Sequence, residues 1–127
     1  MEIPGPSARR HMLISALSVV AAAPSAQVAW LEKYDVPADE IALGFDDVFP
    51  LAGGLVEEGE LGPGVLCELQ RIDEVFEEMT RDAQGNRWTR AVLSTDAGWA
   101  RARHLARAVL VAEGESDPPL PEICIVR

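Results

Sequence analysis

The chain has 127 residues and a formal net charge of −10 at pH 7, because 21 acidic residues stand against 11 basic ones. Its length suffices for one domain with its own core, and a hydrophobic fraction of 48% argues against a disordered chain. With a single lysine and a pI near 4.5, the protein lacks the clustered basic residues that a nucleic-acid-binding protein needs for phosphate contacts.

The acidic residues are segregated along the sequence. Residues 32–78 contain 14 acids against Lys33 and Arg71, a net charge of −12, whereas residues 79–112 carry a net charge of +4. Such an acidic segment favours a basic partner, or it serves only solubility.

The N-terminal part divides into a leader and an apolar segment. Residues 1–7 contain two prolines and a glycine, which predicts a flexible leader. Residues 12–23 are apolar except for two serines, and we interpret them as a buried first helix. Because two arginines precede this segment and alanines end it, it also resembles a secretory or twin-arginine signal peptide, which would make the protein an exported one. The segment is too short to span a membrane.

Three amphipathic segments follow. A helix is expected over residues 26–34, with Ser25 as its N-cap. A second helix over residues 37–49 has acidic residues in its first turn, where they interact favourably with the helix dipole. In residues 63–79 the apolar positions recur every three or four residues, which predicts a helix with one buried stripe. The stripe consists of Val65, Leu69, Ile72, Phe76 and Met79. The turn over residues 57–64 should fold the second and third helices into a hairpin.

The C-terminal third is predicted to contain one long helix and an extended tail. Ser94 or Thr95 can cap a helix with an apolar inward face and a basic outward face. The inward residues are Trp99, Ala102, Leu105, Ala106 and Val109, and the outward residues are Arg101, Arg103, His104 and Arg107. We expect this basic face to be solvated or docked on the acidic hairpin. Three prolines exclude a helix after it, so residues 117–127 should form an extended tail.

These elements together predict an all-α fold. Five separable apolar stripes joined by short loops are typical of a bundle of about five helices. We therefore expect a single helical domain over residues 1–127, with the flexible leader at one end and the extended tail at the other.

The sequence carries no motif for catalysis, for a metal or for a cofactor. Only Cys67 and Cys124 are present, so a zinc site of the usual spacing is absent and free thiols are expected. No Gly-Lys-Ser/Thr element accompanies the glycines, and His104 has no recognisable nucleophile beside it. We therefore predict a protein without enzymatic activity.

The most specific functional feature lies on the acidic helix over residues 37–49. At 100° per residue, four acidic side chains occupy the side opposite the apolar face, and Leu43 falls among them. An apolar residue ringed by carboxylates can anchor a basic, partly apolar partner, whereas the plainer interpretation is a surface leucine covered by another helix. With the acids of the following turn, the predicted partner-binding residues are Asp39, Leu43, Asp46, Asp47, Glu57 and Glu58.

These features favour a cytoplasmic, non-enzymatic binding protein that holds a basic protein partner, as an immunity-type or antitoxin-type inhibitor would. An alternative is a small scaffold subunit that self-associates, with the acidic hairpin of one copy facing the arginine helix of another. Neither a nucleic acid nor a membrane is expected as a partner.

Overall fold

A computed structural model describes residues 5–82, 87–115 and 120–121, and throughout these residues the fold is all-α, as predicted. The α-helices are α1 (Pro6–Ala21), α2 (Pro24–Tyr34), α3 (Asp39–Val48), α4 (Ala52–Glu57), α5 (Leu66–Arg81) and α6 (Ala97–Ala112). Three short 3-10 helices accompany them: η1 (Phe49–Leu51), η2 (Pro63–Val65) and η3 (Arg90–Val92). The described part thus has one α-helix more than the expected five, because the chain after Pro50 forms the separate short helix α4.

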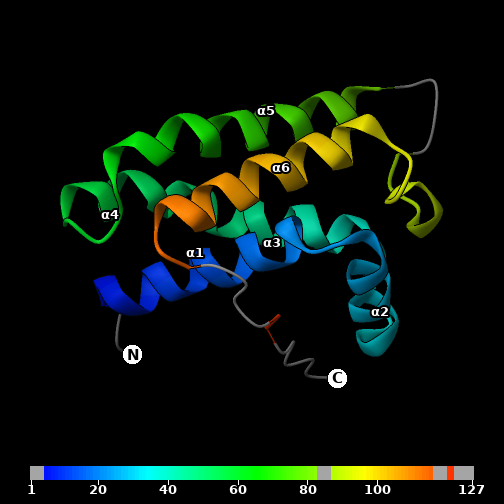
Figure 1. Ribbon diagram of the computed structural model, residues 1–127, viewed down its shortest axis with the longest axis horizontal. Coiled ribbons are helices and arrows are strands. Elements are labelled where there is room, and N and C mark those ends of the chain that lie inside the picture. The colour runs from blue at the N-terminus through cyan, green and yellow to red at the C-terminus, as the bar shows by residue number, and fades with distance from the viewer. Residues whose placement is uncertain (1–4, 83–86, 116–119, 122–127) are drawn as a thin grey trace.

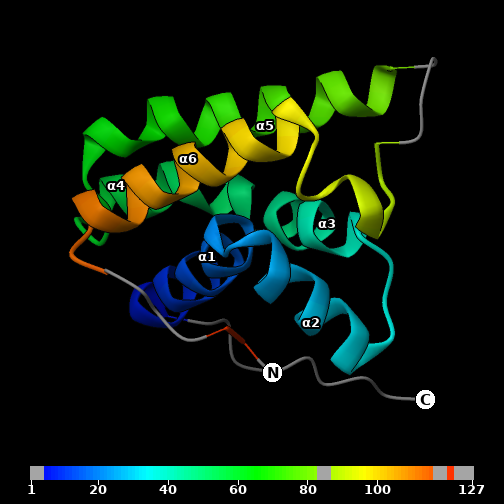
Figure 2. The ribbon, with the colours of Figure 1, turned by 45° about the vertical axis from the view of Figure 1, so that its right-hand side comes forward.

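The bundle is organised around α1 and α6. The helix α1 packs on α6 and on α3, and α5 packs on the other side of α6. Figure 1 shows α5, α6 and α1 one below another, with α2 turning away from α1. The chain bends by 116° between α1 and α2. In Figure 2, α1 and α3 lie below the pair formed by α5 and α6. The buried side chains of these helices form one hydrophobic cluster.

The first helix begins earlier than the sequence indicated. Its first residue is Pro6, so Pro6 and Ser7 are helical and are not part of a flexible leader, while residues 1–4 lie outside the described part. Proline suits this first turn because its missing N–H would have no partner there. As predicted, the apolar segment is buried, with Leu13 and Leu17 fully covered.

The C-terminal end of α1 is held by side chains from two other helices. The last carbonyl groups of a helix have no hydrogen-bond donor within it. Here Gln27 Nε2 donates to the carbonyls of Val19 (3.0 Å) and Val20 (3.1 Å), Arg107 Nε to that of Ala21 (2.8 Å), and Arg103 Nε to that of Ala22 (2.9 Å). Two of these donors are guanidinium groups, whose positive charge also suits a helix C-terminus.

This arrangement corrects the prediction for the arginine face of α6. Arg103 is only 9% exposed, and its Nη2 donates to Gln27 Oε1 (3.0 Å) and to the carbonyl of Leu93 (2.9 Å). Arg103 is therefore neither solvated nor docked on acidic residues. Arg107 is exposed, as predicted, although its Nε binds the last carbonyl of α1. Arg101 and His104 are exposed, as predicted.

The caps of two helices also differ from expectation. At the start of α6, Asp96 accepts hydrogen bonds from the backbone N–H groups of Gly98 (2.7 Å) and Trp99 (3.3 Å), so neither Ser94 nor Thr95 is the cap. The helix α2 begins at Pro24 and has no side-chain cap, although Ser25 was expected to cap it. At the start of α6, Asp96 is a better cap than a serine or threonine would be, because its second oxygen also accepts a hydrogen bond from Arg87 (2.9 Å).

Little of the predicted extended tail falls within the described residues. Of residues 117–127 only Leu120 and Pro121 are described, and the carbonyl of Pro121 accepts a hydrogen bond from Trp30 Nε1 at 2.9 Å. Cys67 is an exposed free thiol on α5, while Cys124 lies outside the described part.

Candidate protein-binding groove

A groove of about 630 Å³ separates α3 from α5. It exists because α3 directs its main apolar face to α1 and α5 directs its own to α6, so the two acidic helices do not close on each other as a tight hairpin. Its described lining residues are Asp39, Ala42, Leu43, Phe45, Asp46, Asp73, Phe76, Glu77, Thr80, Arg81 and Trp88, and we call this site the α3/α5 groove.

The floor of the α3/α5 groove is aromatic. The ring centroids of Phe45 and Phe76 lie 6.0 Å apart in an edge-to-face arrangement, and Trp88 follows at 6.1 Å from Phe76. Trp99 of α6 supports Phe76 from within the core at 5.5 Å. Phe45, Phe76 and Trp99 belong to the hydrophobic core, which fixes these three rings, whereas Trp88 lies in the turn before η3 and packs against the core.

The rim of the α3/α5 groove is acidic on both sides. Asp39 and Asp46 come from α3, and Asp73 and Glu77 come from α5. None of these four carboxylates forms an ion pair with another described residue, although Arg81 lies in the same lining.

Asp73 experiences the charge of this rim most strongly. Partial burial raises the pKa of Asp73 above its usual value, and the negative charges of Glu77, Asp46 and Glu74 raise it further. The cause is physical: a carboxylate that loses water and gains negative neighbours is harder to ionise. A cation placed in the α3/α5 groove would therefore relieve a repulsion that the chain itself leaves uncompensated.

Three of the six predicted partner-binding residues meet in the α3/α5 groove. They are Asp39, Leu43 and Asp46, and the Leu43 side chain is 51% exposed. Asp47 lies instead in a second groove, between α1 and α3. Glu57 is exposed at the end of α4 and lines neither groove. The sixth residue, Glu58, is discussed next.

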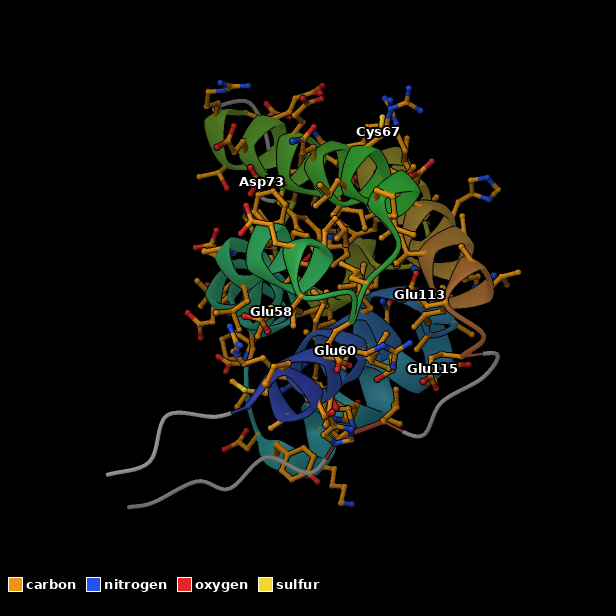
Figure 3. The ribbon with its side chains drawn as sticks, turned by 90° about the vertical axis from the view of Figure 1, so that its left-hand side faces the viewer. Glu58, Glu60, Cys67, Asp73, Glu113 and Glu115 are labelled. Atoms are coloured by element: carbon orange, nitrogen blue, oxygen red, sulfur yellow. The ribbon has the colours of Figure 1, made fainter. Side chains whose placement is uncertain are left out.

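Glu58 and its neighbours take part in holding the bundle together. Both Glu58 carboxylate oxygens accept hydrogen bonds from Arg9 Nη2, at 2.9 and 2.7 Å. Figure 3 shows Glu60, Glu113 and Glu115 gathered beside α1. There, Arg10 donates to the carbonyl of Glu60 (2.9 Å), to the carbonyl and carboxylate of Glu113, and to the carboxylate of Glu115 (2.9 Å). Glu58 is thus already paired with a cation of its own chain.

The second groove, of about 590 Å³, lies between α1 and α3. Met12, Ile41 and Val48 contribute apolar side chains, and Leu120 and Pro121 of this chain line it as well. Two residues of the C-terminal part of the chain therefore already border the second groove, and Trp88, in the turn before η3, borders the α3/α5 groove.

Sequence reasoning missed the α5 wall and the aromatic floor. Asp73 and Glu77 are four residues apart at the edge of the α5 apolar stripe, so the sequence alone places them on the same side of the helix. What the sequence did not reveal is that this side faces Asp46 across an open groove, because periodicity does not say which helix stands opposite. Figure 3 shows Asp73 and Cys67 on different sides of α5.

The described part of the chain contains no group of three or more His, Cys, Asp or Glu side chains placed to hold a metal ion. Within the same ranges no single helix is both long enough and apolar enough to cross a membrane.

No protein-family model, curated protein or solved structure matches this chain. The groove geometry and its charge are therefore the basis for the functional interpretation.

Proposed function

We propose that this protein is a non-enzymatic binding module that holds a basic protein partner in the α3/α5 groove, in the manner of an immunity-type or antitoxin-type inhibitor. One observation carries the proposal: Asp39, Asp46, Asp73 and Glu77 surround an apolar floor and have no ion pair with another described residue. Lys or Arg side chains of a partner would neutralise this rim, and apolar side chains would cover Leu43.

Self-association through the arginine helix has less support. Arg103 of α6 is buried and donates hydrogen bonds to the carbonyls of Ala22 and Leu93, so it is occupied within the chain. Arg101, His104 and Arg107 are exposed on α6, and Arg107 donates one hydrogen bond to the carbonyl of Ala21. A heterologous basic partner is therefore the proposal that we develop.

Two adjacent residues allow a sharp test. Asp46 and Asp47 are both exposed, yet only Asp46 lines the α3/α5 groove. Asp46→Lys and Asp47→Lys change the net charge equally, so a difference between them reports on position and not on total charge. We expect a pull-down from the native host at low salt to recover a basic protein with the wild type and with Asp47→Lys. The recovered protein should elute as the salt concentration rises.

The expected result for Asp46→Lys is at least about a tenfold loss of affinity for that protein, since a like charge then faces the partner's cation. Dissociation constants measured by titration calorimetry with the recovered protein would quantify the loss. Equal affinities of the two variants would contradict the proposal, as would recovery of this chain alone.

A further inference from the structure

We infer that the occupant of the α3/α5 groove is one amphipathic helix of the partner, with Lys or Arg on both sides of a narrow apolar stripe. This inference rests on the proposed function and specifies the shape and chemistry of the segment that is bound. It follows from three properties of the groove: its walls, its floor and its rim.

The two walls of the groove are the sides of helices over about two turns. On α3 the lining runs from Asp39 through Leu43 to Asp46, and on α5 from Asp73 through Glu77 to Thr80. The α3 wall thus covers eight residues and the α5 wall, with Arg81, nine residues, so each wall is about 10 to 12 Å long. Because α1 packs on the far side of α3 and α6 on the far side of α5, the open position between them is one that a further helix of the bundle would take.

The hydrogen bonds that a bound backbone needs favour a helix over an extended peptide. A backbone that is buried must have its N–H and C=O groups paired. The described residues contain no strand to which an extended peptide could add its backbone hydrogen bonds. A helix satisfies these groups internally and needs only side-chain contacts from the groove.

A polyproline peptide fits less well. Such peptides dock on aromatic rings that project from a surface. In the α3/α5 groove, Phe45 is fully buried and Phe76 is 6% exposed, so neither ring projects from the surface.

The rim determines the charge pattern of the bound helix. Carboxylates stand on both walls, two from α3 and two from α5, so cations are needed on both flanks of the apolar stripe. Leu43 and Ala42 on one wall and Phe76 below provide the apolar surface that the stripe would cover. An amphipathic helix with basic flanks meets both requirements at once.

Synthetic peptides can test the inference directly. The probes are amphipathic peptides of about 16 residues, long enough for measurable helicity, with a stripe of Leu, Ile or Phe and Arg on both flanks. Each probe is paired with a control of the same composition. The single proline stands at the first position in the probe, where a helix tolerates it, and in the middle of the control, where it breaks the helix.

We expect each helical peptide that binds to do so at least about tenfold more tightly than its interrupted control, as measured by calorimetry. Amide shifts in NMR spectra should be concentrated in α3 and α5, and Asp46→Lys should weaken binding more than Asp47→Lys. If interrupted and helical peptides bind equally and both respond to Asp46→Lys, the helix inference is wrong while the proposed function stands. If no peptide binds, or if the two lysine variants behave alike, both are overturned.

Discussion

At the scale of single residues, the buried guanidinium of Arg103 has the clearest structural role. It binds the carbonyls of Ala22 and Leu93 and the side chain of Gln27, even though burial and the charge of Arg107 lower its pKa. A methionine of similar length would leave these acceptors buried without a donor. We expect Arg103→Met to reduce the free energy of unfolding by about 3 kcal/mol or more in urea denaturation.

Two further variants show whether the effect comes from this geometry. Arg101→Met, at an exposed position of the same helix, should change the free energy of unfolding by no more than about 0.5 kcal/mol. Arg103→Lys should fail to restore stability, since one ammonium group cannot reach three acceptors that a planar guanidinium spans. Equal losses for Arg101→Met and Arg103→Met would contradict the assigned role.

Asp73 should show the opposite behaviour, because its ionised form opposes folding. Its pKa is raised in the folded protein, so the native state holds the proton more tightly than the unfolded chain does. Ionised Asp73 therefore lowers stability above its folded pKa, and the effect disappears as pH falls below the unfolded value of about 3.9. We expect Asp73→Asn to unfold at higher urea concentration than the wild type at pH 7, with a difference that shrinks towards pH 4.

Glu57 provides the control for this measurement, because it is exposed, lines neither groove and is not among the charges that raise the pKa of Asp73, so Glu57→Gln removes the same charge elsewhere. A gain in stability as large as that of Asp73→Asn would mean that total charge, and not the groove, is responsible. Under the proposed function the same Asp73→Asn variant should bind the basic partner less tightly, so stability and binding would change in opposite directions.

At the scale of secondary-structure elements, the start of α6 depends on Asp96. The pKa of this carboxyl is lowered chiefly by its hydrogen bond with Arg87, and the N–H groups of Gly98 and Trp99 lower it further. A lowered pKa means that ionised Asp96 stabilises the fold above about pH 3.9, and that this contribution is lost as pH falls through the folded pKa. We expect Asp96→Ala to reduce the free energy of unfolding by about 1 to 2 kcal/mol at pH 7.

Ser94 supplies the comparison, because the sequence alone made it a candidate for the same cap. Ser94→Ala should leave the urea midpoint nearly unchanged, and the deficit of Asp96→Ala should narrow in acid. A larger loss from Ser94→Ala than from Asp96→Ala would show that the sequence-based cap is the correct one.

The elements that could be predicted from the sequence are those whose signal is local. The stripe from Leu69 to Met79 and the inward face of α6 are confirmed as buried, because periodicity records which side of a helix avoids water. The burial of Arg103 could not be predicted, because the carbonyl groups that it binds belong to a helix about 80 residues away in the sequence. The same limit applies to the candidate site. The α3 wall, with Asp39, Leu43 and Asp46, could be predicted from the sequence, whereas the position of α5 opposite it depends on how the helices pack.

At the scale of the whole molecule, Arg10 joins regions that are far apart in the sequence. Its contact with Glu115 spans 105 positions, and α1 also packs on α6. Contacts between distant parts of a chain raise the contact order and slow folding, because a long loop must close before they form. The core of this protein therefore depends on its first and last helices meeting.

This dependence has a consequence during synthesis. When α1 leaves the ribosome, α3 is made soon after it but α6 has not yet been made, so the side of α1 that packs on α6 stays uncovered until residues 97–112 have been translated. Until then the nascent chain presents that side of an apolar segment to chaperones and to the export machinery. Capture of this segment by other proteins therefore competes with its burial beneath α6. The rate of burial depends on how soon α6 is made and packs on α1.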